Sequence, residues 1–238
     1  MILSKNSVDL ILQAAEIGHV LGVDGIILDN DKGLRGYNDV DGVVITSTGS
    51  VDFGPTSIGL ARLSSLRQKA TVMSKEETYT VETVDHPNKP NIVEKLIFNS
   101  GHMDFEFRCA LPRTITDVDP KQLNITKLFN CDITDEDITL MMRAKRGMSG
   151  DFMTIQMVNG ELQFRFSDDT GDILNIKADT ELNKLGKDDL VSLTINTKKM
   201  FPIFKMAVHD GKFRLNILQK NIILLNINTL DVLVMPEV

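Results

Sequence analysis

The sequence has no tryptophan and only two tyrosines among its 238 residues. Proteins that hold single-stranded nucleic acid stack the bases on aromatic rings, so this scarcity argues against that class. Cysteine is scarce too. Cys109 and Cys131 stand far apart with no C-x-x-C pair, which excludes a recognisable zinc site or disulfide framework. We expect reduced thiols and a cytoplasmic protein.

Membrane-directed segments are also lacking. No stretch approaches the roughly 20 apolar residues of a membrane span, and the opening MILSKNSVDL lacks the basic region and long apolar run of a signal peptide. We therefore expect no membrane partner. The net charge of -7 and pI near 5.1 argue against a protein that grips nucleic acid with its whole surface. A local basic surface on an acidic protein remains compatible with these values.

Catalytic motifs are few and weak. There is no Walker A sequence and no G-x-G-x-x-G, and the four histidines include no i, i+4 pair that would hold a metal. Asp169-Thr170-Gly171 spells the aspartic-protease triplet, but it stands between two further aspartates and is typical of a hairpin turn. The segment 29–33 resembles a calcium loop without the glutamate that should follow. We expect no enzymatic activity, no metal and no cofactor.

The length and the pattern of elements predict two similar α+β domains. A chain of 238 residues is long enough for two units of roughly 100–120 residues. We expect a first domain over 1–111, a connector over 112–132 that contains Pro112 and Pro120, and a second domain over 133–238. Each half runs helix, hairpin, strand, basic helix or turn, then several strands. This is a repeat of element order with almost no residue identity.

In the first half, apolar periodicity predicts a helix over 4–21, a hairpin over 25–37 and a strand over 43–47. A second helix over 56–66 follows Gly54-Pro55, with the proline near its first turn. Strand-like alternation within 71–84 precedes two breaks, His86-Pro87 and Lys89-Pro90. Further strands are expected over 92–98 and 103–111.

In the second half, the Asn159-Gly160 turn predicts a hairpin over 152–166. Asn196 is the expected cap of a short helix that Pro202 kinks or shortens. The remaining strands are expected over 172–178, 190–195, 212–218, 222–227 and 230–235.

The segment Ile133–Gly147 predicts a helix with its charges sorted by end. Thr134 stands at the cap position, and Asp137 stands three residues on, as in a capping box. Acidic residues fill the first turn and basic residues the last, as the helix dipole favours. Ile138, Met141 and Met142 form one apolar face, and we expect Gly147 to end the helix as its C′ residue.

Basic residues recur on the predicted helices, although the protein is acidic. They are Lys5, Arg62, Arg67, Lys69, Arg143, Lys145, Arg146, Lys198, Lys199 and Lys205.

Four segments resemble the sliding clamps of T-even-type tailed bacteriophages and, more distantly, proliferating cell nuclear antigen. They are MILSKNSVDLILQAAEI at the start, IGLARLSSL after Pro55, ITDEDITLMMRAKRGMSGDFMTIQMVNGELQF in the second half, and LTINTKKMFPIF. The order of elements matches over nearly the whole chain. The region 86–100 departs from the phage pattern by adding residues.

The resemblance implies a head-to-tail homotrimer of two-domain protomers, with helices lining a ring and sheets outside. The implied partners are duplex DNA, a DNA polymerase, a clamp loader and further copies of the chain. The basic residues of the predicted helices are the implied DNA-binding residues, because a positively charged helix face contacts phosphates without reading the sequence. The implied subunit interface joins the strand carrying Phe105, Phe107 and Cys109 to the strand carrying Ile173, Asn175 and Lys177 of a neighbour. The implied partner groove involves Leu128, Phe129, Met235 and Pro236; Leu128 and Phe129 are expected to be an exposed pair in a polar linker.

Two other functions are compatible with the residues. One is a non-enzymatic phage structural or scaffold protein, in which the basic helices contact other subunits. The other is a carboxylate-dependent nuclease that uses Asp29, Asp31, Asp168 or Asp169.

Overall fold

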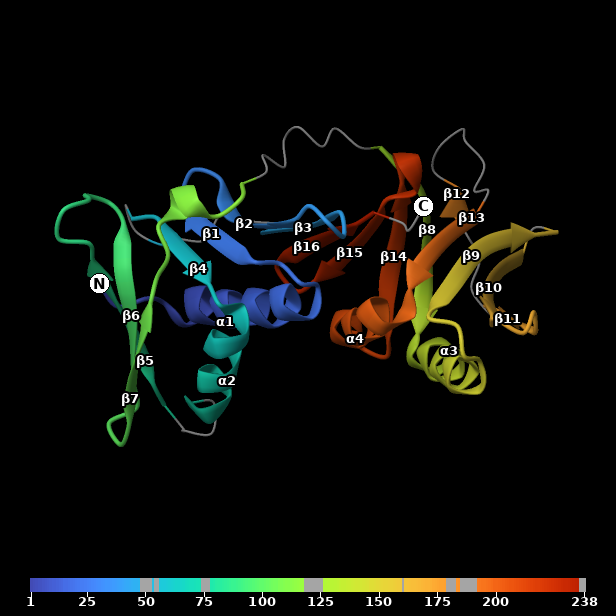
Figure 1. The fold of residues 1–238 in the computed structure, drawn as a ribbon, viewed down its shortest axis with the longest axis horizontal. Helices are drawn as coiled ribbons and strands as arrows, with labels where there is room; N and C mark the ends of the chain where they lie inside the picture. The colour runs from blue at the N-terminus through green and yellow to red at the C-terminus, as the bar shows by residue number, and fades with distance from the viewer. Residues whose placement is uncertain are drawn as a thin grey trace. The chain divides into compact units, whose positions relative to one another are not determined.

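The computed structural model describes residues 1–47, 53, 56–73, 78–117, 126–159, 161–178, 183–184 and 192–235. The chain divides into two compact units, Met1–Leu123 and Asn124–Val238 (Figure 1). Among the described residues, no helix is long and apolar enough to cross a membrane.

In its described part, the first unit has two antiparallel sheets and two α-helices that pack against each other, with α1 also against β1 (Figure 1). One sheet has the order β3-β2-β1-β4, and the other has the order β5-β6-β7. The elements are α1 (Lys5–Val20), β1 (Gly25–Asp29), β2 (Gly33–Asn38), β3 (Val43–Ser47), β4 (Ile58–Ala61), α2 (Leu63–Met73), β5 (Thr80–Asp85), β6 (Val93–Asn99), β7 (Asp104–Arg108) and η1 (Pro112–Thr114).

Helix α1 forms as its sequence predicts. The side chain of Ser4 accepts a hydrogen bond from the Ser7 amide at 3.2 Å, which satisfies one of the free amides of the first turn. Leu10, Ile11 and Ala14 lie buried on the face toward the sheet. The chain leaves the helix through Gly22, whose φ of 66° is the left-handed conformation that glycine adopts without strain.

The helix expected over 56–66 is wrong. Residues 58–61 form β4, which pairs antiparallel with β1, and α2 begins only at Leu63. A Cβ at Gly59 would lie 2.4 Å from the Ala110 carbonyl oxygen, so β4 approaches a second backbone where only glycine fits. Arg62, with a φ of 56°, then turns the chain from strand to helix. Gly54-Pro55 lies outside the described residues.

The described residues of the second unit likewise form two sheets and two α-helices. Its sheets have the orders β11-β10-β9-β13 and β12-β8-β14-β15-β16. The elements are β8 (Lys127–Thr134), α3 (Asp135–Gly147), β9 (Phe152–Val158), β10 (Glu161–Ser167), β11 (Ile173–Lys177), β12 (Asn183–Lys184), β13 (Ser192–Asn196), α4 (Thr197–Ala207), β14 (Lys212–Leu218), η3 (Gln219–Asn221), β15 (Ile223–Ile227) and β16 (Leu230–Val234).

The two units follow one plan, which is more regular than the sequence suggests. The order β3-β2-β1-β4 corresponds to β11-β10-β9-β13, and β5-β6-β7 corresponds to β14-β15-β16. Helices α1 and α3 precede the first of these sheets, and α2 and α4 connect it to the second. Residues 1–3 take the place of β8: the Leu3 amide donates to the Val81 carbonyl, and the Thr83 amide donates to the Met1 carbonyl.

Several details differ from the sequence-based expectations. Gly147 is the last helical residue of α3 with Met148 as the C-cap, so it is not a left-handed C′ residue. Helix α4 continues to Ala207, so Pro202 does not end it. Residues 71–73 belong to α2, and the strand begins only at Thr80. Part of the segment expected as connector, from Lys127 onward, is strand β8.

Candidate nucleic-acid interface

The two helices that occupy equivalent places in the repeat, α2 and α4, carry basic residues without acidic ones. Helices α2 and α4 together contain five lysine and arginine residues and no aspartate or glutamate. Helices α1 and α3 carry charges of both signs. Since the whole chain has a net charge of -7, the cations of α2 and α4 stand out against an acidic background. They are Arg67, Lys69, Lys198, Lys199 and Lys205.

Helix α3 presents its charges in the predicted order. The Thr134 side chain accepts from the Asp137 amide at 3.1 Å, and the Asp137 carboxylate accepts from the Thr134 amide at 2.9 Å, completing the capping box. Ile138, Met141 and Ala144 are the buried apolar face, whereas Met142 is only half-buried. Arg143 and Arg146 are exposed.

Lys145 and Lys198 both form ion pairs with Asp151, a residue that the sequence analysis did not single out. Asp151 accepts from the Lys145 ammonium at 2.8 Å and from the Lys198 ammonium at 2.5 Å. The hydrogen bonds from Lys145 and Lys198 hold the pKa of Asp151 below its usual range. The partners come from six residues before Asp151 and 47 after it, so no local sequence pattern marks the site.

In the first unit, two of the predicted DNA-binding cations stand over aromatic rings of β7. The Arg62 guanidinium lies 5.3 Å from the centre of the Phe107 ring, and the Lys69 ammonium lies 5.7 Å from that of Phe105. Such contacts are worth about 0.5–1 kcal/mol at exposed sites. Arg62 also donates to the Arg108 carbonyl at 3.0 Å. The structure thus brings together residues that the sequence assigned to two surfaces, DNA contact and subunit interface.

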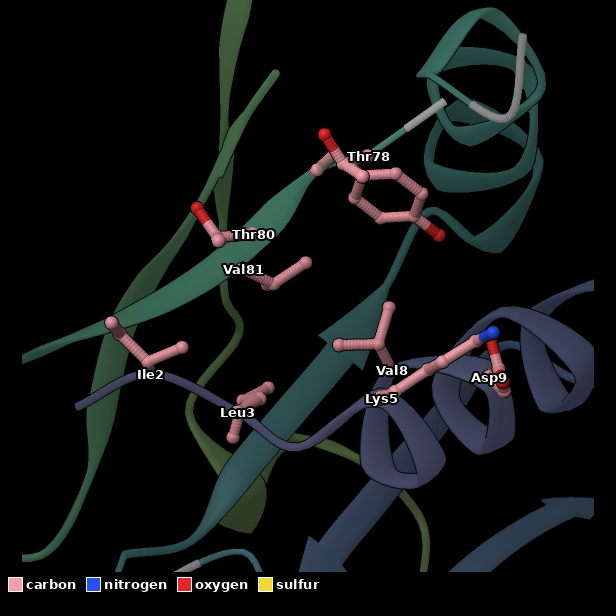
Figure 2. Close-up of a pocket in the computed structure, with 9 residues that line it drawn as sticks. Ile2, Leu3, Lys5, Val8, Asp9, Thr78, Thr80 and Val81 are labelled. Atoms are coloured by element: carbon pink, nitrogen blue, oxygen red, sulfur yellow. The ribbon is translucent and has the colours of Figure 1, made fainter. Parts of the chain in front are cut away.

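The remaining predicted cations are placed differently. Arg67 is close to Glu16 of α1, with 3.5 Å between the charged atoms, and both side chains are exposed. Lys5 lies at the start of α1 beside Asp9, on the edge of a cavity of about 260 Å³ whose apolar lining includes Leu3 and Val8 (Figure 2). Lys205 is exposed, and Lys199 is half-buried.

The implied subunit interface falls on two sheet edges. Among the described residues, β7 pairs only with β6, and β11 pairs only with β10. Every residue of β11 is exposed except Ile176, which is half-buried. Phe107 is buried in its own unit, and Phe105 stacks on Phe98 with ring centres 4.2 Å apart. Cys109 follows β7, and its amide donates to the Glu94 carbonyl.

The expected exposed pair of the partner groove is not exposed. Leu128 and Phe129 are 7% and 4% accessible. Phe129 begins an alternating buried row with Cys131 and Ile133 on β8, as in a strand with one face in a core. Met235 is 42% exposed, and Pro236 lies outside the described residues. Leu218, Ile222 and Leu224 form a separate small apolar cluster with Leu233 packed against it.

Two of the four carboxylates of the nuclease alternative, Asp29 and Asp168, have structural roles. Asp29 accepts from the Lys32 amide and from Arg35. Asp168 accepts from Thr170 and from the Asp172 amide, so the Asp169-Thr170-Gly171 triplet is the hairpin turn that the sequence predicts. Among the residues that the structure describes, no three histidine, cysteine or acidic side chains gather as a metal site would require.

No protein-family model and no curated protein matches the sequence. Solved structures do match. Proliferating cellular nuclear antigen from Entamoeba histolytica superposes with a TM-score of 0.63 over 96% of each chain, at 11% identity. The DNA polymerase III beta chain from Streptococcus pneumoniae TIGR4 superposes with a TM-score of 0.70 at 15% identity; all of this chain is covered, but only 64% of that longer one. The protein therefore has the sliding-clamp fold, an α+β architecture of two clamp-type domains.

Proposed function

We propose that the protein is a sliding clamp, a homotrimeric ring that encircles duplex DNA and tethers a DNA polymerase for processive synthesis. It has no catalytic residue of its own in this proposal. The observation that carries it is the occurrence of five cations and no acid on the equivalent helices α2 and α4, in a chain of net charge -7. A clamp needs cations only where DNA passes, because weak contacts with phosphates permit sliding.

The free edges of β7 and β11 support the ring. They belong to different sheets, so joining β7 of one copy to β11 of the next is a heterologous contact, which closes into a ring when the rotation allows it. Pairing would also cover edges that otherwise invite aggregation. Leu128, Phe129, Met235 and Pro236 remain the proposed groove for polymerase and clamp-loader peptides, although Leu128 and Phe129 are buried. The resemblance of the four sequence segments to T-even clamps makes phage replication in a bacterial cytoplasm the expected setting.

Topological trapping tests this function without a clamp loader. The protein is incubated with a linear duplex whose ends are then blocked by streptavidin, and retention is measured after a wash at high salt. We expect retention only when both ends are blocked, because a ring threads and leaves through free ends. Native mass spectrometry should give a species of three times 26.5 kDa. A monomer at every accessible concentration, with no trapping, would favour the scaffold alternative.

A further inference from the structure

Asp151 joins the two helices of the second unit at one point. It stands between the end of α3 and the start of β9, and its carbonyl oxygen accepts from the Thr197 amide at 2.9 Å and from the Thr197 hydroxyl at 2.8 Å. These bonds fix the Asp151 backbone against the first residue of α4. Its side chain is thereby held beside Lys198, the second residue of that helix.

The two lysines that share this carboxylate differ in accessibility. Lys145 is 21% exposed and also donates to the Gly150 carbonyl at 2.6 Å, so it is anchored on both sides. Lys198 is 69% exposed, and Asp151 is the partner that its ammonium contacts, at 2.5 Å. A carboxylate and a phosphate present similar anionic oxygens to an ammonium group. A phosphate that approaches α4 therefore meets a Lys198 that already has an anionic partner.

We propose that Asp151 competes with DNA phosphates for Lys198 and thereby lowers the affinity of the clamp for duplex DNA. The inference rests on the proposed function, since it requires that α4 faces DNA. Sliding requires that each phosphate contact breaks easily. An intramolecular carboxylate that lowers the affinity of Lys198 for phosphate would therefore favour sliding. Asp151 acts through Lys198 and is a positioning residue rather than a DNA contact.

The first unit provides an internal comparison. Asp24 stands directly before β1, as Asp151 stands directly before β9. Gly25 pairs with Ala61 as Phe152 pairs with Asn196, so Leu63 stands where the second unit has Lys198. The carboxylate is present in both units, and the exposed lysine is present only in the second. Asp24→Asn is therefore a matched control, with the same change of charge at the equivalent position.

The experiment measures binding of a fluorescein-labelled 30-base-pair duplex by anisotropy at 25 to 200 mM salt. Asp151→Asn should bind roughly 3- to 10-fold more tightly than wild type at low salt, because one more phosphate contact is available. The slope of log K against log salt should steepen by about 0.9, the value for one contact. Asp24→Asn should show neither change.

A second pair of variants keeps the test independent of any loss of folding in Asp151→Asn. In the wild-type background, Lys198→Gln should weaken binding less than Lys205→Gln, because Lys198 is already partly neutralised. In the Asp151→Asn background, Lys198→Gln should remove the whole increase in affinity for the duplex. Equal losses for the two lysines, or wild-type affinity in Asp151→Asn, overturn the competition. If wild type binds no duplex even at 25 mM salt, the proposed function fails, and this inference fails with it.

Discussion

The guanidinium of Arg35 holds the carboxylate of Asp117, a residue 82 positions further along the chain. Nε donates to Oδ1 at 2.7 Å and Nη2 to Oδ2 at 3.2 Å. Arg35 is only 4% exposed, and Nη2 also donates to Asp29 at 2.9 Å. The pair fixes the chain to the β1–β2 hairpin three residues after the end of η1.

Breaking this pair should destabilise the first unit. Asp117→Asn leaves a buried guanidinium with weaker partners, and we expect a loss of about 1–3 kcal/mol in the free energy of unfolding, measured by urea denaturation at pH 7. Asp117→Glu, which keeps the charge, should lose less. Equal stability of wild type and Asp117→Asn would show that the ion pair contributes nothing to the free energy of unfolding.

The loss of stability on replacing Arg35 should depend on pH. Burial alone would raise the pKa of Asp29, but the hydrogen bond from Arg35 and further bonds lower it overall. A lowered folded-state pKa gives stability that is present above the unfolded pKa of about 3.9 and disappears as the pH falls through the folded value. Arg35→Met should therefore be more destabilising at pH 7 than at pH 3, as compared by thermal unfolding. The same deficit at both values would contradict the ionic account.

Reversing the charges of the second unit's helices should abolish trapping on DNA. The variant replaces Arg143, Arg146, Lys198 and Lys199 with Glu, and we expect the trimer mass and circular dichroism to stay unchanged. Single reversals should do much less, since the contacts are spread and are screened over about 8–10 Å.

The control for this variant carries four reversals outside the α-helices α1 to α4, with the same change of net charge. Its retention on DNA should be closer to that of wild type than the retention of the helix variant is. Trapping by the helix variant at low salt would remove α3 and α4 from the DNA surface, and dissociation of its trimer would instead make the four cations interface residues. The control positions are Lys32, Lys89, Arg113 and Lys220.

The interface can be tested at an amide that points away from the neighbouring strand. The Ala178 amide donates to Leu162, and the Asp168 amide donates to Asp172, so by alternation the Ile176 amide faces β10 and the Asn175 amide faces outward. Asn175→Pro should therefore give monomers with an intact β10–β11 ladder. Asn175→Ala is the control and should stay trimeric. A trimeric Asn175→Pro protein would place the interface elsewhere.

The two members of the expected groove pair should respond differently to truncation. Phe129 belongs to the buried row of β8, and Phe129→Ala should cost about 3–5 kcal/mol of stability, as for other buried aromatic residues. Leu128→Ala should cost less and should weaken polymerase association while the trimer persists. Binding that is unchanged in a folded Leu128→Ala protein would remove this residue from the partner groove.

Both thiols should be inert in the folded protein. Burial raises the pKa of Cys109 and of Cys131 to about 12. At pH 8 the thiolate fraction is then roughly a thousandfold lower than for an ordinary cysteine, so the rate of alkylation should fall by about that factor. Two thiols should react promptly in 6 M guanidinium. Fast labelling of native protein at Cys109 would show that the end of β7 opens readily.

Local signals in the sequence predict most elements, because caps, turns and alternation act over a few residues. The Thr134–Asp137 capping box and the turn at Asn159 are of this kind. The helix predicted where β4 forms is an error with a non-local cause. The reason for a glycine at position 59 is the nearby Ala110 backbone, which is 51 residues away in the sequence. The site shows the same division. The basic residues are visible along the chain, but Asp151, and the position of Arg62 and Lys69 over β7, depend on tertiary packing.

Residues 1–3 and strand β8 are equivalent in the repeat but differ in length, so the sheets they border should differ in local stability. Strand β14 lies between β15 and the eight residues of β8. Among the described residues, β5 is bonded on the same side by residues 1–3 alone, through backbone hydrogen bonds at Val81 and Thr83. Amides near both ends of β5 are thus closer to solvent than their equivalents in β14. Hydrogen exchange should be faster there, which makes the first unit's sheet the earlier of the two to unravel under mild denaturant.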